Sequence, residues 1–582
     1  MIWKLKPKAP SAFLKQFPEY SPLVVQLFYE RGLKNQKQID EFFNPDYQQD
    51  IHNPFLLKGM EKAVKRILKA VEKKEKITIY GDFDADGVCS TAILFLTLKK
   101  LGVKEPKIYI PDRDKEGHGF NKEAVKGLAK NRVNLIITVD CGCTDLEEVD
   151  LANSLGIDVI ITDHHTLRDE SPKAAAIINP LQKNDKYPFK KLAGAGVAYK
   201  LACALLSTSK QTPELKKWLL DLTAIATVVD MMPLIGENRT LVKYGLGVLA
   251  QTQWIGLREL MKVAQVVPKV IRTSLNGEPP STNLNVHTLS FVLGPRLNAA
   301  GRMDHANAAF HLLTAQNKKT AENLAKQLSQ SNINRQNLTS KIVQEIESRL
   351  REKFSQSKKP KLIFEGSPDW PVGLVGLAAG KIAEKYHRPT VIYQQKKDII
   401  DASCRTIPGF DLIKVLEQCS DFLDDFGGHK AAAGFQIKNK NLSKVKKVFS
   451  QMSEKIKEKD TISVLDIDAE LLIEEISWQN YDQIQNFAPF GKGNPEPRFL
   501  AKKLEVADLR IVGNGGKHLK LDLIMFDRDS GIAKNFNAIG FGLGEWQEKL
   551  KKGDLIDVVF ELVANEWNDY RSLEMKIIDI KL

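Results

Sequence analysis

Five short β-rich segments alternate with helix-like segments between about residue 75 and residue 180, and this alternation constrains the fold more than any other feature. The β-rich segments cover 77–80, 107–110, 134–139, 158–162 and 176–178. Strands separated by helical segments pair in parallel, because a crossover helix must return the chain to the same edge of the sheet. The pattern therefore predicts an α/β fold built on a parallel sheet.

Acidic side chains follow three of these predicted strands. Asp82, Asp84 and Asp86 come after the first strand, Asp140 after the third and Asp163 after the fourth. A single Asp in such a place is usually a helix cap or a turn residue. Ligands of parallel sheets bind beyond the carboxyl ends of the strands, so three acidic strand ends in register indicate one site.

The alternating spacing of Asp82, Asp84 and Asp86 predicts a metal site. These side chains would point to one side if the strand continues, and unpaired carboxylates packed together repel without cations. A calcium loop is excluded, because the twelfth position counted from Asp82 is Ile93. Asp oxygens with one or two His nitrogens suit Mn²⁺ or Mg²⁺ better than zinc or copper, and two such ions would orient a water for attack on phosphorus.

The charge of the chain favours a polyanionic partner. Its 85 Lys and Arg residues against 72 Asp and Glu give a net charge of +13. Nucleic acid is the leading candidate, although scattered lysines that merely keep the surface soluble explain the composition equally well. A length of 582 residues exceeds what one core supports, so we expect three or four domains.

The location of the protein is predicted from what the chain lacks. Six cysteines in so long a chain form no disulfide framework, so we expect reduced thiols. Lys4 and Lys6 interrupt the apolar stretch that a signal peptide needs, and no apolar run approaches the roughly 18 residues of a membrane span. We therefore expect a cytoplasmic protein without a membrane partner.

The later parts of the chain divide into three regions. No Gly or Pro lies between Gly301 and Pro360, and apolar residues recur there at helical spacing, which predicts a long helix connecting two lobes. From Lys361 the α/β pattern returns. From about residue 465 the chain has β-strands with turns at 514–516 and 568–569, which predicts a small β-barrel.

The acidic motifs resemble those of the DHH phosphoesterases, whose defining triplet is Asp163-His164-His165 in this sequence. The resemblance implies that Asp82 and Asp84 hold one ion and that Asp140 bridges two. It further implies that Asp86, His164 and Asp230 hold the other ion, and that His165 supports the ligands or contacts phosphate. We accordingly treat all seven residues as catalytic.

Most of the chain is also similar to the RecJ family within this superfamily. The similar stretches are 293–302, Asn332 with Arg335, the glycine-histidine motif 427–434, and 490–497, 516–521 and 565–568 in the last region. The resemblance implies a single-stranded-DNA-specific exonuclease that degrades 5′ to 3′ to 5′ mononucleotides in recombination and repair. It also implies a helicase and a single-strand-binding protein as partners, and we expect a monomer.

The same resemblance implies five parts of the chain. They are an N-terminal segment over 1–48, a DHH catalytic domain over 49–300, a connecting long helix over 301–359, a DHH-associated substrate-binding domain over 360–463 and an OB-like barrel over 464–582.

A pocket for a terminal phosphate is implied as well. Arg113 would grip the 5′ phosphate, and Ser403 with Arg405 would add a hydroxyl and a guanidinium fork. The remaining substrate-binding candidates are Arg296, Asn298, Arg302 and His429. In the barrel, Phe490, Trp567 and Tyr570 either stack on bases or belong to the core.

Two other functions are compatible with these motifs. One is a DHH phosphodiesterase acting on cyclic dinucleotides or short oligonucleotides, which needs no strand-guiding barrel. The other is a non-catalytic scaffold that binds single-stranded DNA. The presence of every predicted ligand argues against a scaffold with a decayed site.

Overall fold

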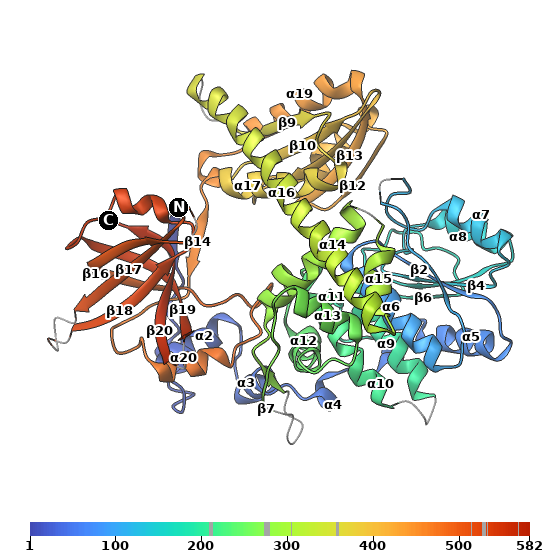
Figure 1. The fold of residues 1–582 in the computed structure, drawn as a ribbon, viewed down its shortest axis with the longest axis horizontal. Coiled ribbons are helices and arrows are strands. Elements are labelled where there is room, and N and C mark those ends of the chain that lie inside the picture. The colour runs from blue at the N-terminus through green and yellow to red at the C-terminus, as the bar shows by residue number, and fades with distance from the viewer. Residues whose placement is uncertain are drawn as a thin grey trace. The chain divides into compact units, whose positions relative to one another are not determined.

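The structure, a computed structural model, describes residues 1–582 except for 114, 209–212, 273–279, 304, 357–359, 514, 527–530, 532 and 568–569. It divides into two compact units (Figure 1). One unit is formed by 46–463, and the other by 1–45 together with 464–582.

The first lobe of unit 46–463 contains the predicted parallel sheet. Its strand order is β3-β2-β4-β5-β6, and every pair is parallel. The strands are β2 (Ile77–Gly81), β3 (Lys107–Tyr109), β4 (Leu135–Val139), β5 (Asp158–Thr162) and β6 (Ala176–Ile178). The α/β fold class is thereby confirmed, with strand boundaries within a residue of those expected.

Helices cover both faces of this sheet because its strands are apolar on both sides. Ile77, Ile79 and Ile137 pack with α5 (Met60–Glu72), α6 (Ala85–Lys100), α9 (Gly194–Ser207) and α11 (Leu220–Val229). Ile136 and Ile161 pack on the other face with α7 (Lys122–Lys130) and α8 (Leu146–Ser154). Continuous burial of this kind is typical of parallel sheets, whose side chains alternate between faces.

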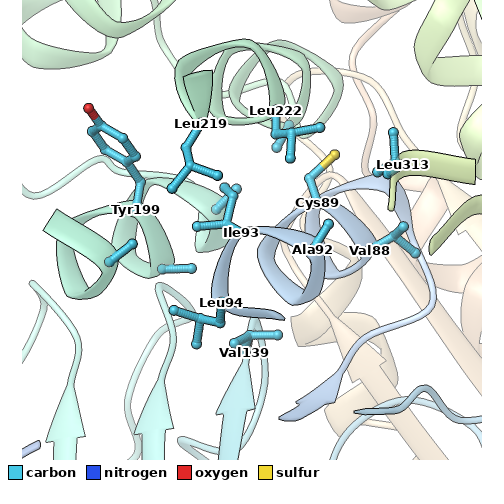
Figure 2. Packing of buried hydrophobic residues seen from close by; sticks show 14 of the residues in the cluster. Val88, Cys89, Ala92, Ile93, Leu94, Val139, Tyr199, Leu219, Leu222 and Leu313 are labelled. Atoms are coloured by element: carbon cyan, nitrogen blue, oxygen red, sulfur yellow. The ribbon is translucent and has the colours of Figure 1, made fainter. Parts of the chain in front are cut away.

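Helix α6 lies at the centre of the larger core. Figure 2 shows its side chains against three other elements: the end of β4, the start of α11 and the last residue of α15 (Asn307–Leu313). The labelled residues include Val88, Ala92, Ile93 and Leu94 of α6, Val139, Leu219, Leu222 and Leu313. This packing fixes the N-terminus of α6, where the acidic motif lies.

The predicted long helix is present but begins later than expected. The chain forms α14 (Gly294–Met303), α15 and then α16 (Lys318–Gln356), which is 39 residues long. The amide of Thr320 donates to Asn317 Oδ1 over 2.9 Å, which caps the start of α16. Helix α16 packs against α13 (Ile255–Val263), α14 and α15 in the first lobe and against α17 (Val372–Tyr386) in the second (Figure 1).

The second lobe is a mixed five-stranded sheet of order β12-β13-β11-β10-β9. Its strands are β9 (Ile363–Ser367), β10 (Thr390–Gln395), β11 (Ile399–Arg405), β12 (Asp425–Gly428) and β13 (Ala432–Lys438). Helices α16 and α17 cover one face, and α18 (Leu412–Glu417) with α19 (Leu442–Glu454) covers the other.

The other unit contains a closed five-stranded barrel, as predicted. Its strands are β16 (Phe499–Val512), β17 (His518–Phe526), β18 (Ala533–Gly540), β20 (Tyr570–Lys581) and β19 (Leu555–Trp567), and pairing of β19 with β16 closes it. Phe490 is half-buried against the barrel core, whereas the side chains of Trp567 and Tyr570 lie outside the described residues. The turns expected at 514–516 and 568–569 include residues that the structure does not describe.

The first 45 residues pack on this barrel and do not form a separate body. Strand β1 (Ile2–Leu5) pairs in parallel with β14 (Val464–Ile467), and α2 (Pro22–Glu30) shares the barrel's hydrophobic core. Phe28 and Phe43 contact Phe487 with ring centroids 5.5 and 5.0 Å apart. The segment expected over 1–48 therefore supplies part of the barrel's core.

Candidate metal centre

Strand β2 ends at Gly81, so Asp82, Asp84 and Asp86 are not arranged along a continuing strand. The chain turns directly into α6, and Asp84 is the N-cap of that helix. Its Oδ1 accepts from the amides of Asp86 and Gly87 over 2.9 and 3.0 Å. The three carboxylates come together through a strand-to-helix turn, which the alternating spacing alone did not predict.

Asp140 follows β4 and lies against α9. Its backbone has a positive φ of 61°, and its amide donates to the carbonyl of Thr162 over 2.9 Å. A Cβ on Gly194 would lie 2.5 Å from Asp140 Oδ1. The first two amides of α9 bind Asp86: Gly194 and Ala195 each donate to its carboxylate over 2.7 Å.

In the triplet after β5, Asp163 holds the backbone of both histidines and the ring of His165. Asp163 accepts from the amides of His164 and His165 and from His165 Nδ1, at 2.7, 3.1 and 2.7 Å. Burial alone would raise the pKa of Asp163, but the His165 hydrogen bond and charge outweigh it and lower the pKa to about 2. Burial likewise opposes protonation of His165, yet Asp163 raises its pKa to about 9. Asp163 therefore orients the His165 ring directly and fixes the backbone of His164 through its amide.

His164 Nε2 faces three carboxylates. It lies 3.1 Å from Asp140 Oδ1, 3.7 Å from Asp230 Oδ2 and 3.8 Å from Asp86 Oδ2. Asp230 reaches this place as the C-cap of α11. Burial lowers the pKa of His164, which leaves a ring nitrogen able to act as a ligand.

These side chains form three overlapping groups with ligand atoms within 4.8 Å of one another. The groups are Asp82, Asp84 and Asp140; Asp86, His164 and Asp230; and Asp140, His164 and His165. Asp140 belongs to two of them, and so does His164. The arrangement gives room for two ions that share a carboxylate between them.

The electrostatics of the centre fit divalent cations. Burial, with repulsion from Asp82 and Asp86, raises the pKa of Asp84 to about 6. Burial and, to a smaller extent, repulsion from neighbouring carboxylates raise the pKa of Asp140 well above its usual range. Asp82 Oδ1 is buried and accepts no hydrogen bond among the described residues. Leaving such a group unpaired is costly, and a cation removes the cost. The mixed oxygen and imidazole set suits Mn²⁺ or Mg²⁺.

A cluster of guanidinium groups lies beside the acidic turn. Arg302 of α14 is partly buried, and this burial together with the charges of Arg113 and Arg335 lowers its pKa to about 9, while Asp84 opposes this shift. Arg405 of β11 also contributes positive charge at Arg302 and donates to Ser403 Oγ over 3.1 Å. Arg113 lies over the ring of Phe83 at 5.3 Å. Three arginines whose charges act on a fourth, Arg302, indicate an anion site.

The other predicted substrate contacts have different surroundings. Asn298 Oδ1 accepts from the amide of Ala85 over 2.7 Å, so it anchors α14 to the acidic turn. Arg296 donates to the carbonyl of Val292 over 2.6 Å and to Ser329 Oγ over 3.4 Å. His429 is exposed in the turn between β12 and β13. In this structure Asn298 and Arg296 therefore anchor neighbouring elements, and the role of His429 stays a prediction.

Two residues at the site had no predicted role. His118 Nδ1 lies 3.4 Å from Asp82 Oδ2. Arg335 belongs to the Asn-x-x-Arg pattern of α16 and donates to Asn332 Oδ1 over 2.9 Å. Its Nε is buried and has no hydrogen-bond partner among the described residues. The pattern at Arg335 was visible in the sequence, but its direction toward Arg302 depends on how α16 packs.

Comparison with known proteins places these domains in a family. Residues 76–227 match the DHH family, N-terminal domain, residues 359–458 match the DHHA1 domain and residues 467–579 match the RecJ OB domain. The structure is similar to the crystal structure of RecJ in complex with Mn²⁺ from Thermus thermophilus, with a TM-score of 0.82 and 27% identity over 100% of this chain and 79% of that one. A second structure of that protein, in complex with Mg²⁺, has a TM-score of 0.75 at 25% identity over 100% of this chain and 78% of that one.

Sequence similarity to curated relatives extends over nearly the whole chain. The chain is 36% identical to the single-stranded-DNA-specific exonuclease RecJ of Bacillus subtilis, over 96% of this chain and 68% of that protein. It is 30% identical to the protein of the same name from Haemophilus influenzae, over 96% of this chain and 95% of that protein. This similarity, together with the three matched domains, shows that the chain belongs to the RecJ family.

Proposed function

We propose that this protein is a metal-dependent exonuclease that degrades single-stranded DNA from the 5′ end to 5′ mononucleotides by two-metal-ion hydrolysis. The observation that carries the proposal is a pair of ligand groups, one containing Asp140 and the other His164, whose Nε2 lies 3.1 Å from Asp140 Oδ1, beside the guanidinium cluster. The RecJ relatives and the RecJ OB domain support single-stranded DNA as the substrate. The 5′ to 3′ direction comes from the family resemblance.

The ions, when bound, supply Lewis acidity and an activated water. Asp82 and Asp84 would hold one ion, Asp86, His164 and Asp230 the other, and Asp140 both. The remaining work is done by residues of the chain that are already positioned. His165 Nδ1 is held by Asp163 over 2.7 Å, which fixes the ring in an orientation from which its other nitrogen would contact a phosphate oxygen.

The guanidinium cluster would bind the terminal phosphate and so place the next phosphodiester at the carboxylates. Gly301 lies against the backbone of Phe83, where an added Cβ would be 2.5 Å from the carbonyl oxygen, so α14 holds Arg302 next to the acidic turn. Guanidinium forks match several oxygens of a terminal phosphate. Binding of the end itself explains release of one nucleotide at a time.

An end-labelled digestion tests the proposal. Asp140→Asn should abolish release of mononucleotides from a long single strand while binding of that strand, measured by fluorescence anisotropy, is retained. Arg405→Ala should lower kcat/KM for a 5′-phosphorylated strand by about tenfold or more and change it little for a 5′-hydroxyl strand. Arg258→Ala, which removes an exposed arginine of α13, is the matched control. Full cleavage by Asp140→Asn would refute the two-ion mechanism.

The rival activity on cyclic dinucleotides is less well supported. Such enzymes need no barrel to guide a strand, whereas β16–β20 form a closed one here. Comparison of mononucleotide release from a long strand with hydrolysis of cyclic dinucleotides and short oligonucleotides distinguishes the two.

The cellular location, the oligomeric state and the protein partners also belong to the proposal. No helix in the described parts of the chain has the length and apolar character needed to cross a bilayer. We propose a cytoplasmic monomer that works with a helicase and a single-strand-binding protein in repair and recombination. Sedimentation velocity tests the monomer, and an increase in the digestion rate of duplex DNA on adding a helicase tests the partnership.

A further inference from the structure

His118 lies at the solvent side of the acidic turn. Its Nδ1 is 3.4 Å from Asp82 Oδ2, and its ring lies 4.3 Å from the ring of Phe83. The His118 side chain is 69% exposed, whereas the Asp82 side chain is 11% exposed. The imidazole is therefore open to solvent on one side and contacts a buried carboxylate of the centre on the other.

The loop that carries His118 is anchored close to the ring on both sides. Gly117 and Gly119 flank it with positive φ values of 78° and 87°, which glycine adopts without strain. The carbonyl of Gly119 accepts from Tyr80 Oη over 3.0 Å. Glu116 Oε1 accepts from Tyr109 Oη over 2.5 Å. These contacts tie the loop to β2 and β3, the strand ending in the acidic turn and its neighbour.

The carboxylate group nearest His118 lacks a nitrogen donor. Asp82, Asp84 and Asp140 offer only oxygen atoms, whereas the groups around His164 include imidazole nitrogens. Donor atoms that share one octahedral ion at about 2.1 Å lie roughly 3 Å apart, so a separation of 3.4 Å is close to that of neighbouring ligands. A surface ion pair between His118 and Asp82 is the simpler explanation of this contact, and such a pair contributes only about 0–1 kcal/mol.

We propose that His118 is an additional ligand of the ion held by Asp82, Asp84 and Asp140. This assignment rests on the proposed two-ion centre. It gives each half of the centre an imidazole nitrogen, His164 on the inner side and His118 on the solvent side. Because nitrogen ligands favour Mn²⁺ over the harder Mg²⁺, His118 makes this half of the centre selective for Mn²⁺.

Metal binding measured without DNA tests the proposal. In the Mn²⁺-loaded full chain, electron spin echo envelope modulation should detect imidazole nitrogens from His118 as well as His164. His118→Gln should remove part of the nitrogen signal and weaken one Mn²⁺ site by about tenfold or more, with a smaller effect on Mg²⁺. His118→Asp should restore tight binding through an oxygen donor but not the nitrogen signal. His311→Gln, which alters an exposed histidine of α15, is the control.

The outcomes separate this inference from the proposed function. If His118→Gln leaves both the nitrogen signal and the Mn²⁺ affinity unchanged while Asp140→Asn abolishes Mn²⁺ binding, the role of His118 is refuted and the two-ion centre stands. If Asp140→Asn also leaves Mn²⁺ binding unchanged, the centre itself is refuted.

Discussion

Gly194→Ala tests how closely the fold must hold the metal ligands. Gly194 begins α9, and its amide and that of Ala195 each bind Asp86 over 2.7 Å. On its other side, Gly194 lies against the carboxylate of Asp140. One methyl group at this position should therefore disturb Asp140, the proposed shared ligand, and the contacts of Asp86, a second proposed ligand.

The size of the effect follows from the distances. An alanine Cβ would lie 2.5 Å from Asp140 Oδ1 and 2.7 Å from its Cβ and Cγ, whereas ordinary contacts begin near 3.4 Å. Asp140 or the start of α9 must therefore move by about 0.9 Å. A misplacement of about 1 Å costs roughly 100-fold in rate. Overpacking of this kind also destabilises the fold by about 1–3 kcal/mol.

The assay is single-turnover digestion of a 5′-labelled strand, together with Mn²⁺ titration and thermal unfolding. Gly127→Ala is the matched control, because Gly127 lies within α7 and an added Cβ there meets nothing within 4 Å. That variant should keep the wild-type rate and gain about 0.5–1 kcal/mol of stability. A wild-type rate and Mn²⁺ affinity in Gly194→Ala would refute the inference that this contact sets the ligand geometry.

Three further variants test the phosphate cluster and the core. Arg302→Lys should lower kcat/KM for 5′-phosphorylated single strands by about tenfold or more, because an ammonium group cannot make the paired hydrogen bonds of a guanidinium. Equal rates on 5′-phosphorylated and 5′-hydroxyl strands, in the parent protein and in the variant alike, would contradict this. Asp221 is fully buried, and burial raises its pKa to about 7 from 3.8, so the parent protein loses stability as pH rises through this interval. The free energy of unfolding of Asp221→Asn relative to the parent should therefore rise between about pH 4 and pH 8, by at most roughly 4 kcal/mol. Thermal unfolding at several pH values measures this difference, and a pH-independent difference would contradict it. Leu222→Ala, in the core shown in Figure 2, should cost about 2–5 kcal/mol in thermal unfolding, against about 0.5 kcal/mol or less for the exposed Leu155→Ala.

The sheet of the first lobe was predictable because its signals are local. Each apolar run and the acidic residue after it can be identified within about ten residues, and parallel pairing follows from the helices between them. The end of β2 at Gly81 was not predictable in this way. Asp84 caps α6 through its own side chain, and alternating residues look the same whether the strand continues or a helix begins.

The missed features depend on contacts between distant parts of the chain. Strand β1 pairs with β14 across more than 450 residues, and nothing within either segment specifies the partner. His118 was visible in the loop after β3, but its contact with Asp82 depends on anchors at Tyr80 and Glu116. Periodicity likewise located α16 without showing which face would direct Arg335 toward Arg302.

The guanidinium cluster is assembled from arginines of both lobes. Arg113 comes from the loop after β3, Arg302 from α14, Arg335 from α16 and Arg405 from β11 of the second lobe. Arg302 also donates to the carbonyl of Gly373 over 3.1 Å, which joins α14 to α17. Like charges repel, so the packing of α16 against both lobes and the contact of α14 with α17 must hold these groups together. The proposed recognition of a terminal phosphate therefore depends on the packing between the lobes, while all the proposed metal ligands come from the first lobe.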